Sequence, residues 1–194
     1  MLRQINQRYL KVVVFNLSLV PMFYIIYQIL TNQLGPEPIK DITHHTGKWT
    51  LYFIVITLAM TPLKKITKLN VWINYRRMFG LFIFFYSSVH LMTYVGLDYR
   101  FDLTSIGGDI IKKKYIFIGF TAWLLLIPLA VTSNKRMMKI LKDKWKKLHR
   151  LIYLISLFGV IHYLWLVKRD LTEPLIFLAI ILILLTFRLK FKGN

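Results

Sequence analysis

The sequence predicts an all-α integral membrane protein in which six transmembrane helices form one bundle. Three observations predict this class: 56% of the 194 residues are hydrophobic, the chain contains six uncharged runs of 14–20 residues, and basic residues gather between those runs. A helix needs about 20 apolar residues to cross a bilayer, so six spans use nearly the whole chain. We therefore expect residues 1–194 to form a single transmembrane domain, without a separate soluble domain.

The uncharged runs and the turn residues between them define the expected elements in order. Gly35-Pro36 and Pro38 predict a loop after the first run, and Gly107-Gly108 predict a flexible point in the acidic loop after the third run. The second run is short for a span, and we expect its flanking lysines to reach the membrane interface. The expected spans are residues 12–30, 49–63, 78–97, 115–134, 149–167 and 172–188.

The distribution of charge predicts how this bundle is oriented. Six spans place both termini on one side, which collects 19 of the 27 lysines and arginines, whereas the other side carries seven of the eight acidic residues. Basic loops stay in the cytoplasm, so both termini are expected there, with the acidic loops outside. The net charge of +19 then indicates contact with anionic lipid and not with nucleic acid. The absence of cysteine excludes disulfides, iron–sulfur clusters and thiolate zinc sites.

Two histidines at matching depth are the strongest candidate site. His90 follows Arg77 by 13 residues and His162 follows His149 by the same number, which is about 20 Å along a helix. Both should therefore lie near the outer face, on helices that can be neighbours. A lone histidine in a span can simply hydrogen-bond an adjacent helix, but two imidazoles at one depth form an axial ligand pair for a b-type heme.

The inner side of the bundle is less complete. A second heme held in the same way requires a histidine near Arg76 and Arg77, opposite His149. Arginine is not an iron ligand, but these two residues and Arg150 are suited to pair with propionates or with a flavin phosphate. Thirteen steps along one helix leave His149 about 140° around from His162. His149 therefore faces a different neighbour or holds a second heme with another partner, and the spacing leaves both open.

His44 and His45 lie in the expected outer loop just before the second span. Adjacent exposed histidines are most often solvated, although they can also reach an outer cofactor or a docked partner, and His44 is the preferred candidate. The aromatic residues near the paired histidines are interpreted as core packing and interface belt. They are Phe82, Phe84, Phe85, Tyr86, Tyr94, Tyr163 and Trp165. The sequence contains no G-x-G-x-x-G or Walker A pattern, so no classical nucleotide-binding domain is expected.

Several segments that carry these residues resemble the MsrQ (YedZ) family of heme-binding membrane subunits, which belongs to the ferric-reductase-like transmembrane group. The resemblance covers nearly the whole chain in order. The matching segments are KDITHHTG (40–47), TLAMTPL (57–63), RRMFGL (76–81), FFYSSVH (84–90), LAVTS (129–133), WKKLHRLIYL (145–154) and IHYLW (161–165).

The resemblance implies a six-span b-type cytochrome of the bacterial inner membrane that holds one or two hemes b and also uses FMN. It implies electron transfer from a cytoplasmic flavin reductase or the quinone pool to a periplasmic molybdopterin methionine sulfoxide reductase that repairs oxidised proteins. The family's heme histidines fall on His90, His149 and His162, and its loop histidine falls on His44. His45 stands where the family more often has an apolar or aromatic residue, so no role is carried onto it.

The combined interpretation is an electron-transfer subunit without substrate chemistry of its own. Electrons are expected to enter at the basic inner face and to leave from the outer histidine pair. A metal-reducing cytochrome is an alternative in the same class, although such enzymes usually carry a fused nucleotide-binding domain. A transporter or assembly protein with structural histidines is the alternative from another class.

Overall fold

The computed structural model describes the backbone of residues 2–190 and the side chains of residues 7–188, and this part of the chain contains helices and connections but no strand. Its helices follow one another along the chain and differ widely in length. They are α1 (Leu2–Leu30), α2 (Pro38–Thr67), α3 (Val71–Met92), the π-helix η1 (Thr93–Asp98), α4 (Leu103–Lys112), α5 (Lys114–Val131), α6 (Lys135–Leu141), α7 (Asp143–Leu148), α8 (Leu151–Leu166) and α9 (Thr172–Lys190).

Five segments of the described chain are long and apolar enough to cross a membrane. They are Gln7–Leu30, Pro38–Thr67, Val71–Asp98, Lys114–Val131 and Asp143–Leu166. The expectation of an all-α, multi-pass membrane protein is confirmed. The sixth expected span falls on α9, which is not among these five, so the count of six remains a prediction.

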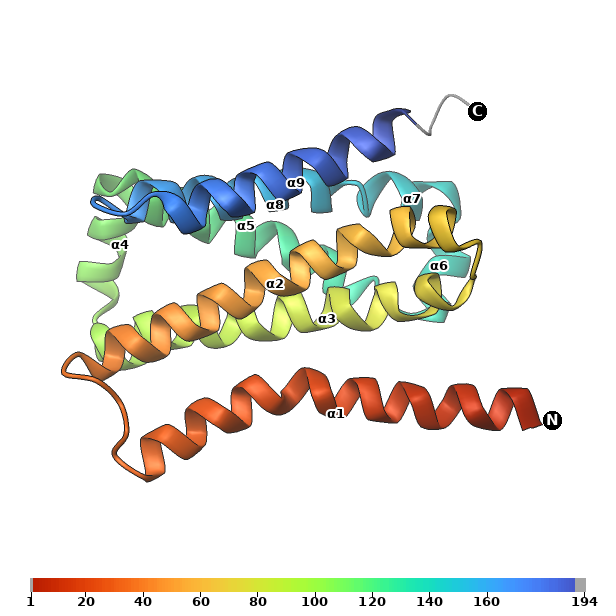
Figure 1. The fold of residues 1–194 in the computed structure, drawn as a ribbon. Helices are drawn as coiled ribbons and strands as arrows, with labels where there is room; N and C mark the ends of the chain where they lie inside the picture. Colours follow the sequence, from red (N-terminus) through yellow and green to blue (C-terminus); the bar gives the residue numbers. More distant parts are fainter. Residues whose placement is uncertain (1, 191–194) are drawn as a thin grey trace.

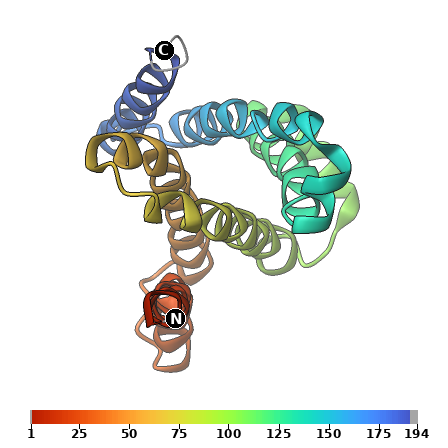
Figure 2. The same ribbon diagram turned by 90° about the vertical axis from the view of Figure 1, so that its right-hand side faces the viewer.

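The long helices run side by side and reverse direction at two opposite ends of the molecule (Figure 1). The α1–α2 connection, α4 and the α8–α9 connection lie at one end. The α2–α3 connection, α6, α7, the start of α1 and the end of α9 lie at the other, which we call the basic end because it carries 16 of the 24 lysines and arginines among residues 7–188. Seen along the bundle, α2, α3, α5 and α8 form a ring, with α1 and α9 outside it (Figure 2).

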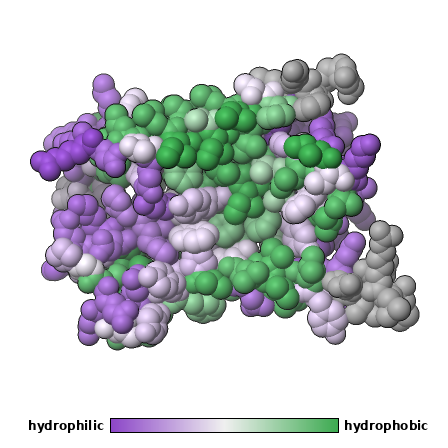
Figure 3. Space-filling view, viewed as in Figure 1, coloured by the Kyte–Doolittle hydropathy of each residue, from purple (hydrophilic) through white to green (hydrophobic). Residues whose placement is uncertain are grey.

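The core lies where the ring helices meet, and its innermost residues are fully enclosed. Leu58, Ile83, Ile155 and Val160 are each no more than 1% exposed. Many large apolar side chains of the outer helices instead face outward, and Phe23 on α1 is 61% exposed. Figure 3 shows apolar residues over the middle of the molecule and hydrophilic residues gathered at its two ends. Apolar surface of this extent is suited to the hydrocarbon region of a bilayer.

The structure corrects three expectations about the connections. The loop expected before the second span ends at Glu37, because Pro38 begins α2 as its first residue, a position where its missing N–H costs nothing. His44 and His45 therefore lie on a helix. Gly107-Gly108 lie inside α4, whose start is capped by the Asp102 side chain through the Thr104 and Ser105 backbone N–H groups.

The third correction concerns the segment that contains two of the candidate histidines. A single helix over residues 149–167 was expected, but α7 ends at Leu148 and α8 begins at Leu151. His149 and Arg150 lie in the turn between them. The 140° separation derived for one continuous helix therefore does not describe His149 and His162.

Candidate functional site

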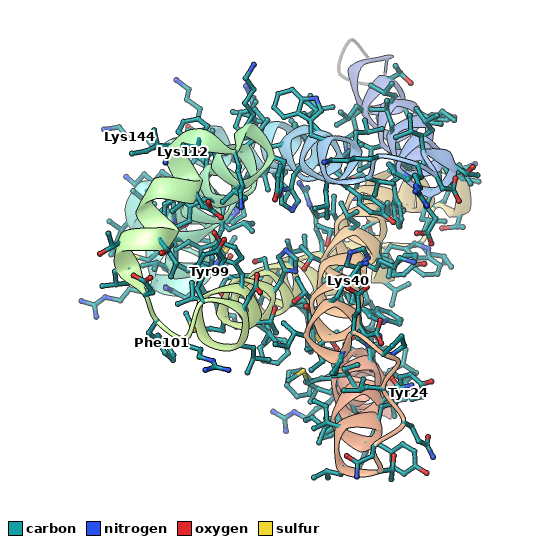
Figure 4. All side chains as sticks on the ribbon, turned by 90° about the vertical axis from the view of Figure 1, so that its left-hand side faces the viewer. Tyr24, Lys40, Tyr99, Phe101, Lys112 and Lys144 are labelled. Carbon is teal, nitrogen blue, oxygen red and sulfur yellow. The ribbon has the colours of Figure 1, made fainter. Side chains whose placement is uncertain are left out.

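A cavity of about 530 Å³ lies inside the ring of α2, α3, α5 and α8. Its walls are largely apolar, with Ile54 and Ile155 among the residues that line it deep in the bundle. Lys40 and Tyr99 also line it, and Figure 4 shows them on facing sides at the end opposite the basic end, which we call the outer end. A space of this size and composition falls in the range of small-molecule and cofactor sites.

The structure brings His90 and His162 together inside this cavity. His90 comes from α3 and His162 from α8, and both line the cavity. Their ring centroids are 6.0 Å apart and their planes meet at 84°. Metal bonds to imidazole nitrogen are about 2 Å long, which places the centroids of two rings on opposite sides of one ion about 6 Å apart. The observed separation therefore suits one metal ion held between the two rings.

Both rings are held by the same type of hydrogen bond. The Nδ1 atom of His90 lies 2.9 Å from the backbone oxygen of Thr43, and the Nδ1 atom of His162 lies 2.6 Å from that of Tyr115. A carbonyl oxygen can only accept, so both Nδ1 atoms carry the proton and both Nε2 atoms of the neutral rings keep a lone pair. Metal-binding histidines commonly have this second hydrogen bond, which fixes the tautomer and the ring orientation.

The donor set restricts what the pair can hold. Among the side chains of residues 7–188, no group of three or more His, Cys, Asp or Glu residues comes together as a metal site. Two imidazoles are too few for a structural zinc site, which takes four protein ligands. They are sufficient for a cofactor that supplies its own equatorial ligands, as a porphyrin does. The residues present therefore fit an axial pair better than a bare metal site.

His149 lies away from this cavity, at the basic end. Its ring stacks on Trp145 with centroids 3.9 Å apart, and its Nε2 atom lies 3.0 Å from Thr132 Oγ1. The Thr132 hydroxyl donates its own hydrogen to the Pro128 carbonyl, so it accepts from His149 Nε2–H. The neutral His149 ring therefore keeps its lone pair on Nδ1, unlike the two cavity histidines.

The three predicted arginines do not share one environment. Arg76 is half-buried on α3, where it interacts with Tyr153 and lies close enough to Arg188 for their charges to interact. Arg188 donates to the Tyr153 hydroxyl at 2.8 Å and to the Leu58 carbonyl at 2.9 Å. By contrast, Arg77 and Arg150 are exposed. Sequence reasoning counted Arg188 only as a basic terminal residue and therefore missed this cluster.

The two adjacent histidines of α2 also have different surroundings. His44 is half-buried and lines the cavity near Lys40 and Lys48. His45 points elsewhere, with its Nε2 atom 2.9 Å from the Pro21 carbonyl oxygen, and it connects α2 to α1. Only His44 of this pair is therefore placed beside the candidate site.

The outer end of the cavity carries a charged cluster outside the apolar spans. Lys113 Nζ lies 2.5 Å from the Asp109 carboxylate, which also accepts a hydrogen bond from the Tyr99 hydroxyl. The Lys113 ammonium and then the Tyr99 hydroxyl lower the pKa of the Asp109 carboxyl. The same contact raises the pKa of the Lys113 ammonium. Both groups are therefore charged at neutral pH.

A bundle of membrane-spanning helices around a pair of half-buried histidines places the chain among multi-pass membrane proteins, and comparison with known proteins identifies its family. A family model described as "Ferric reductase like transmembrane component" matches residues 46–160. The chain is also similar to two proteins named protein-methionine-sulfoxide reductase heme-binding subunit MsrQ. The protein of Xanthomonas euvesicatoria pv. vesicatoria (strain 85-10) is 48% identical over 166 residues, which are 86% of this chain and 76% of that protein. The protein of Herminiimonas arsenicoxydans is 44% identical over 182 residues, which are 92% and 84% of the two chains.

The chain therefore belongs to the MsrQ family, within the ferric-reductase-like transmembrane group. This confirms the family that the sequence motifs resemble.

Proposed function

We propose that this protein is the heme-binding membrane subunit of a protein-methionine-sulfoxide reductase system. In this role it is a b-type cytochrome that carries electrons across the bacterial inner membrane to a periplasmic molybdopterin enzyme that repairs oxidised methionines. The names of its relatives support the system. The observation that carries the proposal is the pair of cavity histidines, His90 and His162. Each ring uses its Nδ1–H to bond a carbonyl oxygen, so each Nε2 atom keeps a lone pair that can bind iron.

The residues of the cavity fit a heme b. His90 and His162 would hold its iron, and the apolar residues around them would keep water away and so help to set its reduction potential. When bound, the group supplies a one-electron redox centre. Lys40, Lys48 and Lys113 line the cavity at its outer end, where their ammonium groups would attract the propionate carboxylates of a bound heme. His44 lies beside them and is assigned to the same site.

The inner side of the proposed path is assigned to the basic end. Arg76, Arg77 and Arg150 are proposed to bind anionic groups there, either propionates of a second heme or the phosphate of FMN. FMN itself is proposed from the family resemblance. His149 is assigned to the second heme. Its Nε2 atom is bonded to Thr132, so its Nδ1 atom has the lone pair that would bind the iron. The electron donor is proposed to be a cytoplasmic flavin reductase or quinol.

The proposed topology places this basic end in the cytoplasm. It has α9 as a sixth span, both termini inside, and contact between the basic residues and anionic lipid. The cavity then opens toward the periplasm, where the partner enzyme would dock. The chain would perform no substrate chemistry of its own.

The family match also favours a second candidate function, because the description of the matching family model names ferric reductase. A metal-reducing cytochrome would use the same histidine pair but would pass its electrons to ferric chelates. A transporter or assembly protein with structural histidines would instead bind no heme. The first measurement is therefore the visible spectrum of the purified protein, in which a cytochrome shows a Soret band and a sharp reduced α-band.

Electron transfer is tested in membranes that contain the protein under anaerobic conditions. A flavin reductase with NADH, or a quinol, should reduce the heme. Adding the periplasmic enzyme together with a methionine sulfoxide should reoxidise it, and adding the enzyme alone should not. If ferric chelates reoxidise the heme but the periplasmic enzyme and its substrate do not, the protein is assigned to metal reduction instead.

A further inference from the structure

Two glycines lie directly against the cavity histidines, one on each side. Gly47 of α2 faces the His90 ring, and Gly119 of α5 faces the His162 ring. We propose that Gly47 and Gly119 are positioning residues that let each imidazole rest on bare helix backbone and so aim its Nε2 atom at the iron. This inference rests on the proposed role of His90 and His162 as heme ligands.

The space beside each glycine is already filled by the histidine. A Cβ atom on Gly119 would lie 2.5 Å from Nδ1 and 2.9 Å from Cε1 of His162. A Cβ atom on Gly47 would lie 3.1 Å from both Cε1 and Nδ1 of His90. Both separations are shorter than ordinary carbon contacts of about 3.5–4.0 Å. Any side chain at either position must therefore push the imidazole away, and the displacement is larger at Gly119.

The glycines also explain how the rings reach their carbonyl partners. Thr43 lies four residues before Gly47, and Tyr115 lies four residues before Gly119. In an α-helix such a carbonyl already accepts the N–H of the glycine, and its second lone pair remains for the histidine Nδ1–H. Side chains on a helix lean toward its N-terminus, so a Cβ at the glycine position lies over the preceding turn and obstructs the approach of the imidazole to that carbonyl.

The same arrangement occurs twice with the same spacing. Thr43, Gly47 and His90 recur as Tyr115, Gly119 and His162, and each member of the second set follows its counterpart by 72 positions. In both sets the carbonyl and the histidine are 47 residues apart. The same arrangement of carbonyl, glycine and histidine therefore holds the histidine in two helix pairs, α2 with α3 and α5 with α8. Two independent helix pairs with this geometry argue that the glycines serve the histidines.

The other glycines of the bundle separate this role from ordinary helix packing. Small residues often let helices approach closely in membranes, and Gly159 is such a case, with its Cβ position 3.4 Å from Leu51. Gly80 on α3 has no atom within 4 Å of its Cβ position. Only at Gly47 and Gly119, among the glycines of the described chain, is the neighbour a histidine ring.

Alanine variants of the heme-loaded protein test the proposal. Gly119→Ala should displace His162, convert low-spin six-coordinate heme into a five-coordinate form and open the reduced iron to carbon monoxide. Heme affinity should fall about 10–100-fold, as for loss of other groups that orient metal ligands. Gly47→Ala should change the spectrum in the same direction by a smaller amount, because its contact is less severe. Gly80→Ala is the matched control and should leave the spectrum and carbon monoxide binding unchanged.

Added imidazole distinguishes a displaced ligand from an unfolded protein. It should restore the low-spin spectrum of Gly119→Ala by taking the vacated coordination position. If Gly119→Ala does not accumulate as folded protein, Gly47→Ala carries the test, since its contact requires a shift of only a few tenths of an ångström. A low-spin wild type with both glycine variants unchanged would overturn the positioning role and leave the proposed function intact. A wild type that binds no low-spin heme would overturn the axial pair and the positioning role together.

Discussion

The two cavity histidines are oriented by main-chain oxygen atoms, which is why both present the same nitrogen to the cavity. Thr43 and Tyr115 each use a carbonyl group, so the side chains at these positions contribute little to the contact. His149 has a different environment, in which a threonine hydroxyl and a stacked indole hold the ring. The three histidines assigned to heme iron therefore fall into one matched pair and one separate residue.

This division predicts different effects of three substitutions. His90→Ala and His162→Ala should each abolish the low-spin heme of the outer site, because the iron loses one of its two axial ligands. His149→Ala should leave that spectral component in place, because its ring lies outside the cavity. The ferric and reduced spectra of the three purified variants provide the measurement, and an identical change in all three would contradict two separate sites.

At the residue scale, the sequence could predict which histidines meet but not how they are held. Counting residues from Arg77 and His149 places His90 and His162 at one depth, and the structure brings these two rings together. The carbonyl partners have no signature in the sequence, because every residue carries the same main-chain oxygen. Gly47 and Gly119 become informative only once their neighbours in space are known.

At the element scale, one carboxylate ties three helices together at the outer end. Glu173 at the start of α9 accepts a hydrogen bond from the Tyr163 hydroxyl of α8 at 2.5 Å. The Lys48 ammonium of α2 lies 2.8 Å from the same carboxylate. The Lys48 and Glu173 side chains are 36% and 46% exposed, so solvent screens the ion pair and the tyrosine hydrogen bond is the larger contribution.

Glu173→Ala should therefore destabilise the packing of α9 against α2 and α8. The expected loss is about 1–2 kcal/mol, since a hydrogen bond to a charged group is worth about 1.5–3 kcal/mol and partial exposure reduces it. Thermal unfolding in detergent provides the measurement. Asp143→Ala is the matched control, because its pair with Lys146 is 88% and 73% exposed and should contribute almost nothing. Equal melting temperatures for wild type and Glu173→Ala would refute this role.

The elements that sequence reasoning missed are those without a long apolar run. Helices α4, α6 and α7 are 10, 7 and 6 residues long and lie within stretches expected to be loops. Short helices of this kind depend on caps and tertiary contacts more than on hydrophobic periodicity. Asn134, for example, caps α6 by accepting the Met137 N–H. The long apolar runs, by contrast, predict α1, α3, α5 and α8, because a helix satisfies all of its backbone hydrogen bonds within one segment inside a membrane.

At the scale of the whole molecule, the fold separates a basic end from an outer end that carries most of the acids. Both described chain ends, α6 and α7 lie together at the basic end (Figure 1). The sequence could predict this separation because loop charge alternates along the chain. It could not predict that α1 stands outside the ring of α2, α3, α5 and α8 (Figure 2), because each span is apolar whether it faces lipid or protein.

The orientation of this molecule in the membrane gives the last prediction. Among residues 7–188, the basic end carries 16 of the 24 lysines and arginines and one of the eight acidic residues. Basic residues near the ends of spans are retained in the cytoplasm, and each one near an anionic leaflet contributes about 1 kcal/mol of attraction. Reporter fusions after Arg77, Lys142 and Asn194 should therefore report a cytoplasmic location, and a fusion after Asp102 should report a periplasmic one. A periplasmic signal after Asn194 alone would mean that α9 does not cross the membrane, whereas inverted signals at all four positions would refute the orientation itself.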